Sequence, residues 1–125
     1  MKILIVNTFD IEGGAARAAY RLHRALLDAG VDSQMLVQSK TSDDDTVTGR
    51  MNRVKTQRAT GIVRSTLDAL PLKVYRNKTS TLFSPAYLPA GGIIDAIKAI
   101  DPDIVHLHWI CGGMIRIEDL CFRSS

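Results

Sequence analysis

Apolar positions in the first 37 residues follow the order strand, helix, strand. Residues 2–7 form a nearly continuous apolar run, as a buried parallel strand does, and residues 31–37 end in a second, shorter run. Between them, residues 14–29 repeat apolar positions every three or four residues, which predicts a helix that Gly30 ends. The residues expected on its buried face are Ala15, Ala18, Ala19, Leu22, Leu26 and Ala29. These elements predict one parallel, right-handed β-α-β unit.

The carboxyl-terminal part predicts a second helix and another strand. Four isoleucines between residues 93 and 100 indicate a short amphipathic helix that Asp101-Pro102 ends, and residues 104–108 form an apolar strand that runs into a glycine turn. The chain between these parts predicts a helix over about 54–70 and a short strand or extended loop at 79–83. The expected fold is a Rossmann-like three-layer α/β sandwich, with parallel strands at about 2–7, 33–37 and 104–108 and the first strand central.

Charge is concentrated in one segment. The chain is 46% hydrophobic and 23% charged, as one globular domain is, but half of its 16 Lys and Arg residues lie in a basic, helical insert at about 50–78. The insert is interpreted first as a solvated face and next as a contact for anionic lipid or a polyanionic acceptor. It lacks a series of interleaved aromatic side chains, which disfavours nucleic acid. The sequence contains neither a membrane-spanning run nor a signal peptide, so we expect a cytoplasmic protein, with the inner face of the membrane as an alternative location.

Gly13 and Gly14 open the first helix directly after a strand. Glycines let a ligand approach the backbone, and a helix start offers unpaired N–H groups to an anion, so a nucleotide-type ligand is expected there. Arg17 is unusual because a cation in the first helical turn opposes the helix dipole. It pairs either with Asp10 or Glu12, or with a ligand phosphate or a carboxylate across a cleft.

His106 and His108 alternate along the last predicted strand, so both are expected on one face. We interpret His106, deeper in the strand, as a hydrogen-bonded core residue, and His108, nearer the loop, as the one that touches a substrate. A metal site is not expected, because a third ligand is missing and His23, the remaining histidine, lies in the middle of the first helix.

These segments together resemble the amino-terminal domain of the GT4-type glycosyltransferases, which have the GT-B fold of two Rossmann domains. The resemblance is carried by residues 3–7, 13–19, 83–85 and 102–109 with Gly112-Gly113. It implies retaining sugar transfer from a nucleotide-sugar to a glycan or lipid-linked acceptor, without metal or cofactor. It also implies that Gly13 and Gly14 lie against the donor diphosphate with help from Arg17, and that His108 faces the reacting sugar. His106 and Trp109 are the supporting residues.

The pattern of this family continues beyond the sequence given. Residues 1–125 are therefore expected to be a partial amino-terminal domain without the donor-binding domain, a fragment or one piece of a split enzyme, inactive alone and with residues 104–108 as an unprotected edge. Two rivals remain. A dinucleotide-dependent oxidoreductase fits poorly, because the third glycine of its motif and an acid after the second strand are missing, where Gln38-Ser39-Lys40 stand instead. The other rival is a non-catalytic Rossmann-like domain that binds an anionic acceptor, membrane or partner chain through the basic insert.

Overall fold

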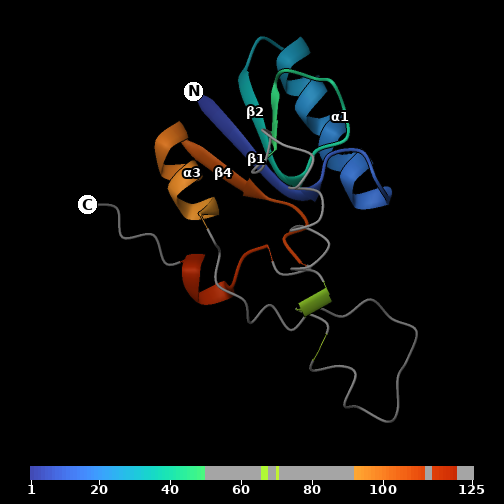
Figure 1. Cartoon of the computed structure of the whole chain (residues 1–125). Coiled ribbons are helices and arrows are strands. Elements are labelled where there is room, and N and C mark those ends of the chain that lie inside the picture. Colours follow the sequence, from blue (N-terminus) through green and yellow to red (C-terminus); the bar gives the residue numbers. More distant parts are fainter. Residues whose placement is uncertain (50–65, 68–69, 71–91, 112–113, 121–125) are drawn as a thin grey trace.

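A parallel sheet of four strands forms the centre of the computed structural model, which describes residues 1–49, 66–67, 70, 92–111 and 114–120. The strands are β1 (Lys2–Phe9), β2 (Asp32–Ser39), β3 (Val47–Gly49) and β4 (Ile104–Leu107), in the order β3-β2-β1-β4 (Figure 1). All three pairings are parallel, and β1 lies between β2 and β4, as the sequence predicted. The three-residue strand β3 was not predicted.

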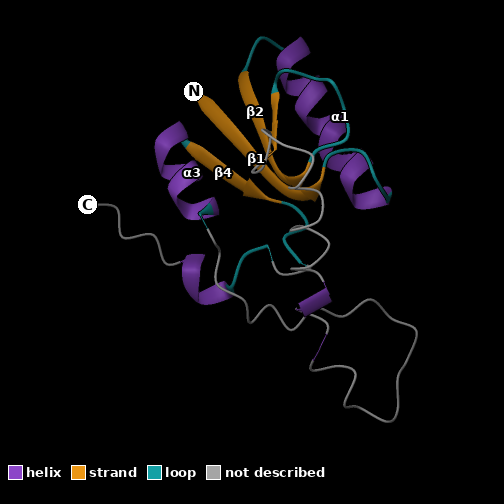
Figure 2. Ribbon diagram, in the orientation of Figure 1, coloured by secondary structure: helices purple, strands orange, loops and turns teal. Residues whose placement is uncertain are grey.

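Helices lie on both sides of this sheet, which confirms the α/β sandwich (Figure 2). Helix α1 (Gly14–Asp28) and helix α3 (Ile93–Ile100) match the predicted ranges 14–29 and 93–100 closely, and a 3₁₀ helix, η2 (Ile117–Leu120), follows β4. Helix α3 begins after Gly92 and ends at Asp101, both with positive φ, so the Asp101-Pro102 stop is confirmed. The predicted strand at 79–83, most of the predicted helix over about 54–70 and most of the basic insert lie outside the described residues, although residues 66–67 are helical.

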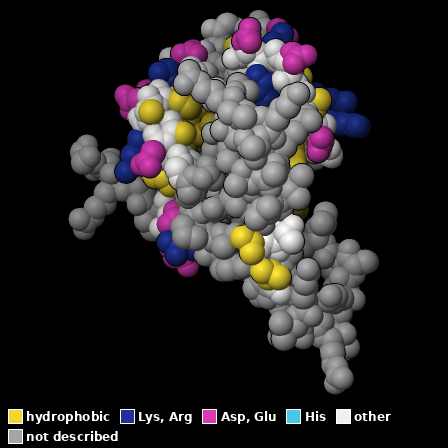
Figure 3. Space-filling model, viewed as in Figure 1, with side chains coloured by type: hydrophobic (Ala, Val, Ile, Leu, Met, Phe, Trp, Pro, Cys, Tyr) yellow, Lys and Arg dark blue, Asp and Glu magenta, His cyan; other side chains and the backbone are white. Residues whose placement is uncertain are grey.

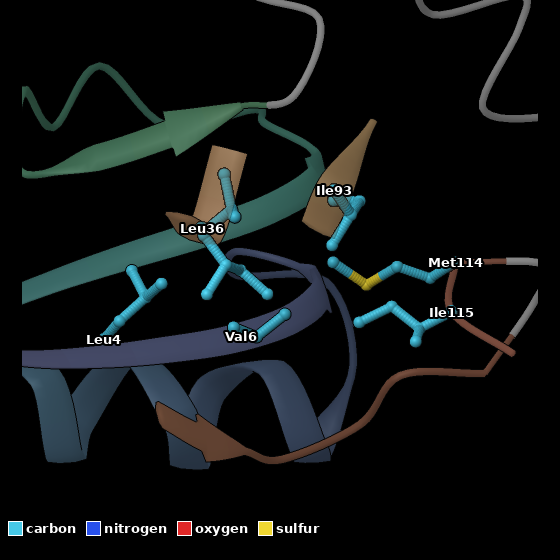
Figure 4. Close-up of a cluster of buried hydrophobic side chains, with 7 residues drawn as sticks. Leu4, Val6, Leu36, Ile93, Met114 and Ile115 are labelled. Atoms are coloured by element: carbon cyan, nitrogen blue, oxygen red, sulfur yellow. The ribbon is translucent and has the colours of Figure 1, made fainter. Parts of the chain in front are cut away.

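One core packs α3 and the segment after β4 against one face of the sheet. Alternate residues of β1 point to this face, where Leu4 and Val6 are fully buried. The cluster consists of Leu4, Val6, Leu36, Ile93, Ile97, Met114 and Ile115, most of which Figure 4 shows converging between β1, β2 and α3. Met114 and Ile115 are buried in this core and cover it beyond the ends of the strands.

The opposite face of the sheet is covered by α1, but by a different stripe of that helix from the predicted one. Ile5, Met35, Val37 and Val47 form this second core together with Ala19 of α1. The buried residues of α1 are Ala16, Ala19 and His23. Ala18, Leu22 and Ala29, predicted to be buried, are exposed, so the expected face is wrong by part of a turn.

His23 takes the central place on this face because hydrogen bonds satisfy its ring. Its Nδ1 lies 2.8 Å from Ser33 Oγ and its Nε2 lies 2.7 Å from Thr46 Oγ1. Thr46 donates its single hydroxyl proton to Asp44 Oδ1, so it must accept the hydrogen bond from His23 Nε2–H. Burial also lowers the pKa of His23 below its usual 6.5, which favours the neutral ring. In that form the ring carries its proton on Nε2, and Ser33 donates to Nδ1. This chain of polar groups joins α1, β2 and the turn before β3.

Charged groups and apolar groups share the surface of the described residues (Figure 3). Three of the large apolar side chains that remain exposed, Ile104, Leu107 and Trp109, belong to β4 or follow it directly. Among the described strands β4 pairs only with β1, so it is an edge strand, as predicted. The described helices are too short or too polar to span a membrane.

Candidate functional site

The candidate site lies where the strand order changes direction. From β1 the chain moves to β2 and β3 on one side, and β4 then pairs with the other side of β1. Ligands of open parallel sheets bind outside the carboxyl ends of the strands at such a switch point. The carboxyl ends of β1 and β4 lead into residues 10–13 and 108–111, which are the segments that carry Gly13 and His108.

Asp10 fixes the first of these segments from within. Its side chain is fully buried and accepts four hydrogen bonds, from Ile11 N–H, Thr41 N–H, Thr41 Oγ1 and Ser42 N–H, over 2.7 to 3.0 Å. Burial raises the pKa of Asp10, but the hydrogen bonds from Ser42 and Thr41 outweigh it and hold the pKa below its usual 3.8. The Asp10 carboxylate thus ties the loop after β1 to the loop after β2.

Asn7 and Thr8 fix the second segment. Asn7 Oδ1 accepts the N–H of Trp109 at 2.9 Å, and the N–H of Thr8 donates to the carbonyl of Trp109 at 2.7 Å. The Thr8 hydroxyl also lies within 2.9 Å of the carbonyls of Trp109 and Cys111. Both side chains are buried at the end of β1, so the main chain after β4 is held in place although the side chain of Trp109 is 41% exposed.

Helix α1 begins at an open surface with a backbone that requires glycine. Gly13 has φ 90° and ψ 169°, a backbone conformation that residues other than glycine rarely adopt. Gly14 is exposed, and a Cβ added there meets nothing within 4 Å. No side chain caps this end of the helix, and its first turn holds no acidic residue. Among the described residues, the N–H groups of that turn therefore have no side-chain acceptor.

Arg17 is exposed in the first turn of this helix. It forms no ion pair with any described residue, so the predicted pairing with Asp10 or Glu12 is not made. Asp10 is occupied by Thr41 and Ser42 instead. The ligand phosphate, the other interpretation of Arg17, remains a prediction.

His106 and His108 share one face of the edge strand, as predicted. Their rings stack with centroids 5.7 Å apart and planes inclined by 25°. Both side chains are exposed, so the prediction that His106 is a hydrogen-bonded core residue is wrong. The reason is the edge position of β4. Helix α1 packs over Ile5 in β1, which lies opposite His106, but it does not extend over β4.

Sequence reasoning missed Asn7, Thr8 and Asp10, which position both segments without being exposed themselves. The signal was available, because three polar residues near the end of a buried parallel strand have to be satisfied by neighbouring loops. Within the described residues, no three His, Cys, Asp or Glu side chains gather in a group that holds a metal ion.

Comparisons with models of known protein families, with curated proteins and with solved structures found no match to this chain. The fold is therefore assigned from its own geometry, a small α/β domain with a four-stranded parallel sheet of Rossmann-like form.

Proposed function

We propose that this chain is the acceptor-side domain of a retaining GT-B glycosyltransferase, which transfers a sugar from a nucleotide-sugar to a polysaccharide or lipid-linked acceptor. The observation that carries this conclusion is the switch point between β1 and β4, from which the loop of Gly13 and the segment of His108 both emerge. Ligands of open parallel sheets bind at this position.

The start of α1 supports an anionic ligand. The positive end of its dipole lies at the exposed Gly14, and its first-turn N–H groups have no capping side chain among the described residues, so both can stabilise an anion there. The guanidinium of Arg17 is exposed nearby in the same turn, without an acidic partner among the described residues. In our proposal these groups contact the donor diphosphate.

The segment after β4 supports contact with sugars. His108 presents an exposed imidazole, which both donates and accepts hydrogen bonds, and Trp109 presents part of an indole ring. Asn7 and Thr8 fix the main chain that carries them, and fixed groups lose little entropy when they bind a substrate. In our proposal His108 faces the reacting sugar, with His106 and Trp109 in support.

Sugar transfer requires a donor and an acceptor held in line in a site from which water is excluded. The exposed switch point supplies one wall of such a site. We therefore propose that a second Rossmann-like unit supplies the nucleotide site and the charges that neutralise the leaving diphosphate. Residues 1–125 alone should bind nucleotides weakly and transfer no sugar.

Chemical-shift mapping with UDP, GDP and inorganic pyrophosphate tests the diphosphate site. We expect weak, saturable shifts in the backbone amides of residues 13–17 and 108–109. Gly14→Val should remove them, because a branched Cβ stands where the diphosphate approaches the backbone. The amide spectrum of the variant shows whether its fold is intact. Shifts confined to other surfaces, or no saturable shifts with any of the three compounds, contradict the proposed site.

Sugar transfer itself is tested in a two-domain protein that joins residues 1–125 to a nucleotide-sugar-binding domain. His108→Ala should lower kcat by roughly 100-fold, as the loss of one group that contacts the reacting centre does. Measurable transfer by residues 1–125 alone, or full activity in both His108→Ala and Gly14→Val, contradicts our assignment. Binding of an acceptor without transfer by the two-domain protein favours the non-catalytic alternative.

A further inference from the structure

We propose that His106 and His108 form a two-imidazole site for a transition-metal ion such as Zn²⁺, Ni²⁺ or Cu²⁺. The proposal uses two side chains that are also part of the proposed sugar site, but it does not require the glycosyltransferase function to be correct. It differs from the expectation of no metal, which rested on the missing third protein ligand and on the position of His23 in the middle of the first helix.

The backbone of β4 holds the two imidazoles on one side of the strand. Hydrogen bonding to β1 fixes both residues, because His106 lies opposite Ile5 and the N–H of His108 donates to the carbonyl of Val6 at 3.0 Å. Residues two apart in a strand point to the same face, and the ring contact between these two shows that they do. Metal binding therefore needs no change in the main chain.

The separation of the rings fits a chelate. With zinc–nitrogen distances of about 2.0–2.1 Å and a tetrahedral angle, two imidazole centres that share one ion lie roughly 5 Å apart. The ring centroids of His106 and His108 are 5.7 Å apart, close to this separation. In our proposal, rotation about the side-chain torsions turns one nitrogen of each stacked ring toward the shared ion. Both rings are exposed, and neither has a hydrogen-bond partner in the described part of the chain that must be given up.

Two protein ligands leave the other coordination positions open to water or to small anions, since the described residues offer no third His, Cys, Asp or Glu. Such a site exchanges its ion readily and follows the general affinity order, with Cu²⁺ above Ni²⁺ and Zn²⁺. Mg²⁺ and Ca²⁺ prefer oxygen ligands and are not expected to bind.

Titration of the isotope-labelled chain with Zn²⁺ tests the site, and the third histidine is an internal control. The ring signals of His106 and His108 should shift together and saturate. Those of His23 should not move, because its ring is buried and both nitrogens are already hydrogen-bonded. Mg²⁺ at the same concentration should cause no shift.

His106→Ala and His108→Ala should each weaken Zn²⁺ binding at least about tenfold, because a single imidazole has no chelating partner. The two variants should bind Zn²⁺ with similarly low affinity, and their amide spectra should retain the pattern of the folded sheet. Shifts of one histidine alone, a change of less than twofold in either variant, or Zn²⁺ binding centred elsewhere in the chain overturns the proposal.

Discussion

Gly13 shows most directly how a single residue determines the loop after β1. Its φ of 90° and ψ of 169° exclude a Cβ without strain, whereas Gly14 has an ordinary φ and open space around it. We expect Gly13→Ala to lower the free energy of unfolding by about 1–3 kcal/mol. The matched variant Gly14→Ala should be neutral or stabilising by about 0.5–1 kcal/mol, because alanine favours the helix. Urea unfolding of both variants measures the difference, and equal losses contradict the backbone explanation.

His23 links stability to pH in a defined direction. Burial lowers its pKa below the usual 6.5, and the opposing effect of the Asp44 charge is smaller. The unfolded chain therefore binds a proton that the folded chain does not, and stability that is complete above pH 6.5 is lost as the pH falls below it. Urea unfolding between pH 7.5 and pH 5 should show this loss. His23→Gln should be less stable at pH 7.5 but show a smaller slope, and an unchanged slope contradicts the assignment.

A second loss of stability belongs to stronger acid. The hydrogen bonds from Thr46 lower the pKa of Asp44 to about 2, with Tyr20 and Arg24 acting in the same direction, and the pKa of Asp10 is also lowered. A carboxyl whose pKa is lowered by folding stabilises above its ordinary pKa of 3.8 and loses that contribution as the pH falls through its folded value. The two losses of stability therefore fall in different pH ranges, and the one that depends on His23 occurs first as the pH is lowered.

Single residues were the least predictable part of this chain. The helical pattern of α1 ranked Leu22 above His23 as a core residue, because a pattern of apolar residues contains no information about distant partners. Ser33 and Thr46 make the burial of His23 favourable, and both lie outside the helix. His106 was misplaced because its burial depends on whether α1 extends over β4 and not on its own neighbours in sequence.

At the scale of elements, the connection between the loops depends on Asp10. Asp10→Asn replaces one acceptor oxygen with an NH₂ group, which must face N–H or O–H donors of Thr41 and Ser42. We expect a loss of about 1–3 kcal/mol in the free energy of unfolding and faster hydrogen exchange at the amides of residues 41 and 42. Glu12→Gln removes an exposed carboxylate from the same loop and is the control. Equal behaviour of the two variants contradicts a role for the Asp10 hydrogen bonds.

Elements were largely predictable because their signals are local. The apolar run of β1, the periodicity of α1 and the isoleucine helix α3 each fill a single stretch of sequence, and their ranges differ from prediction by at most a few residues. Strand β3 was missed because three residues after an acidic turn carry no periodicity. The switch point was partly predictable, since strands 2–7 and 104–108 were expected side by side, but the polar residues that fix its loops were not recognised.

At the scale of the whole molecule, the two strands that flank β1 lie at very different distances from it in the sequence. Leu4 lies opposite Gln34 of β2, about 30 residues away in sequence, and opposite Val105 of β4, about 100 residues away. Closing the longer loop costs roughly 1 kcal/mol more in chain entropy than closing the shorter one. The contact between β1 and β4 is also the smaller of the two, because β4 has only four residues. Both facts make the side of β1 that faces β4 the weaker one.

Neighbouring amides within one strand should therefore report two different opening events. Even-numbered residues of β1 exchange main-chain hydrogen bonds with the β4 side, as Thr8 does with Trp109, and odd-numbered ones face β2. If β4 detaches while the β-α-β unit stays folded, native-state hydrogen exchange along β1 should alternate, with the amide of Thr8 less protected than those of Ile5 and Asn7. The protection of successive amides in β1 would then show the order in which the strands separate. The switch-point site would be lost before the rest of the domain unfolds.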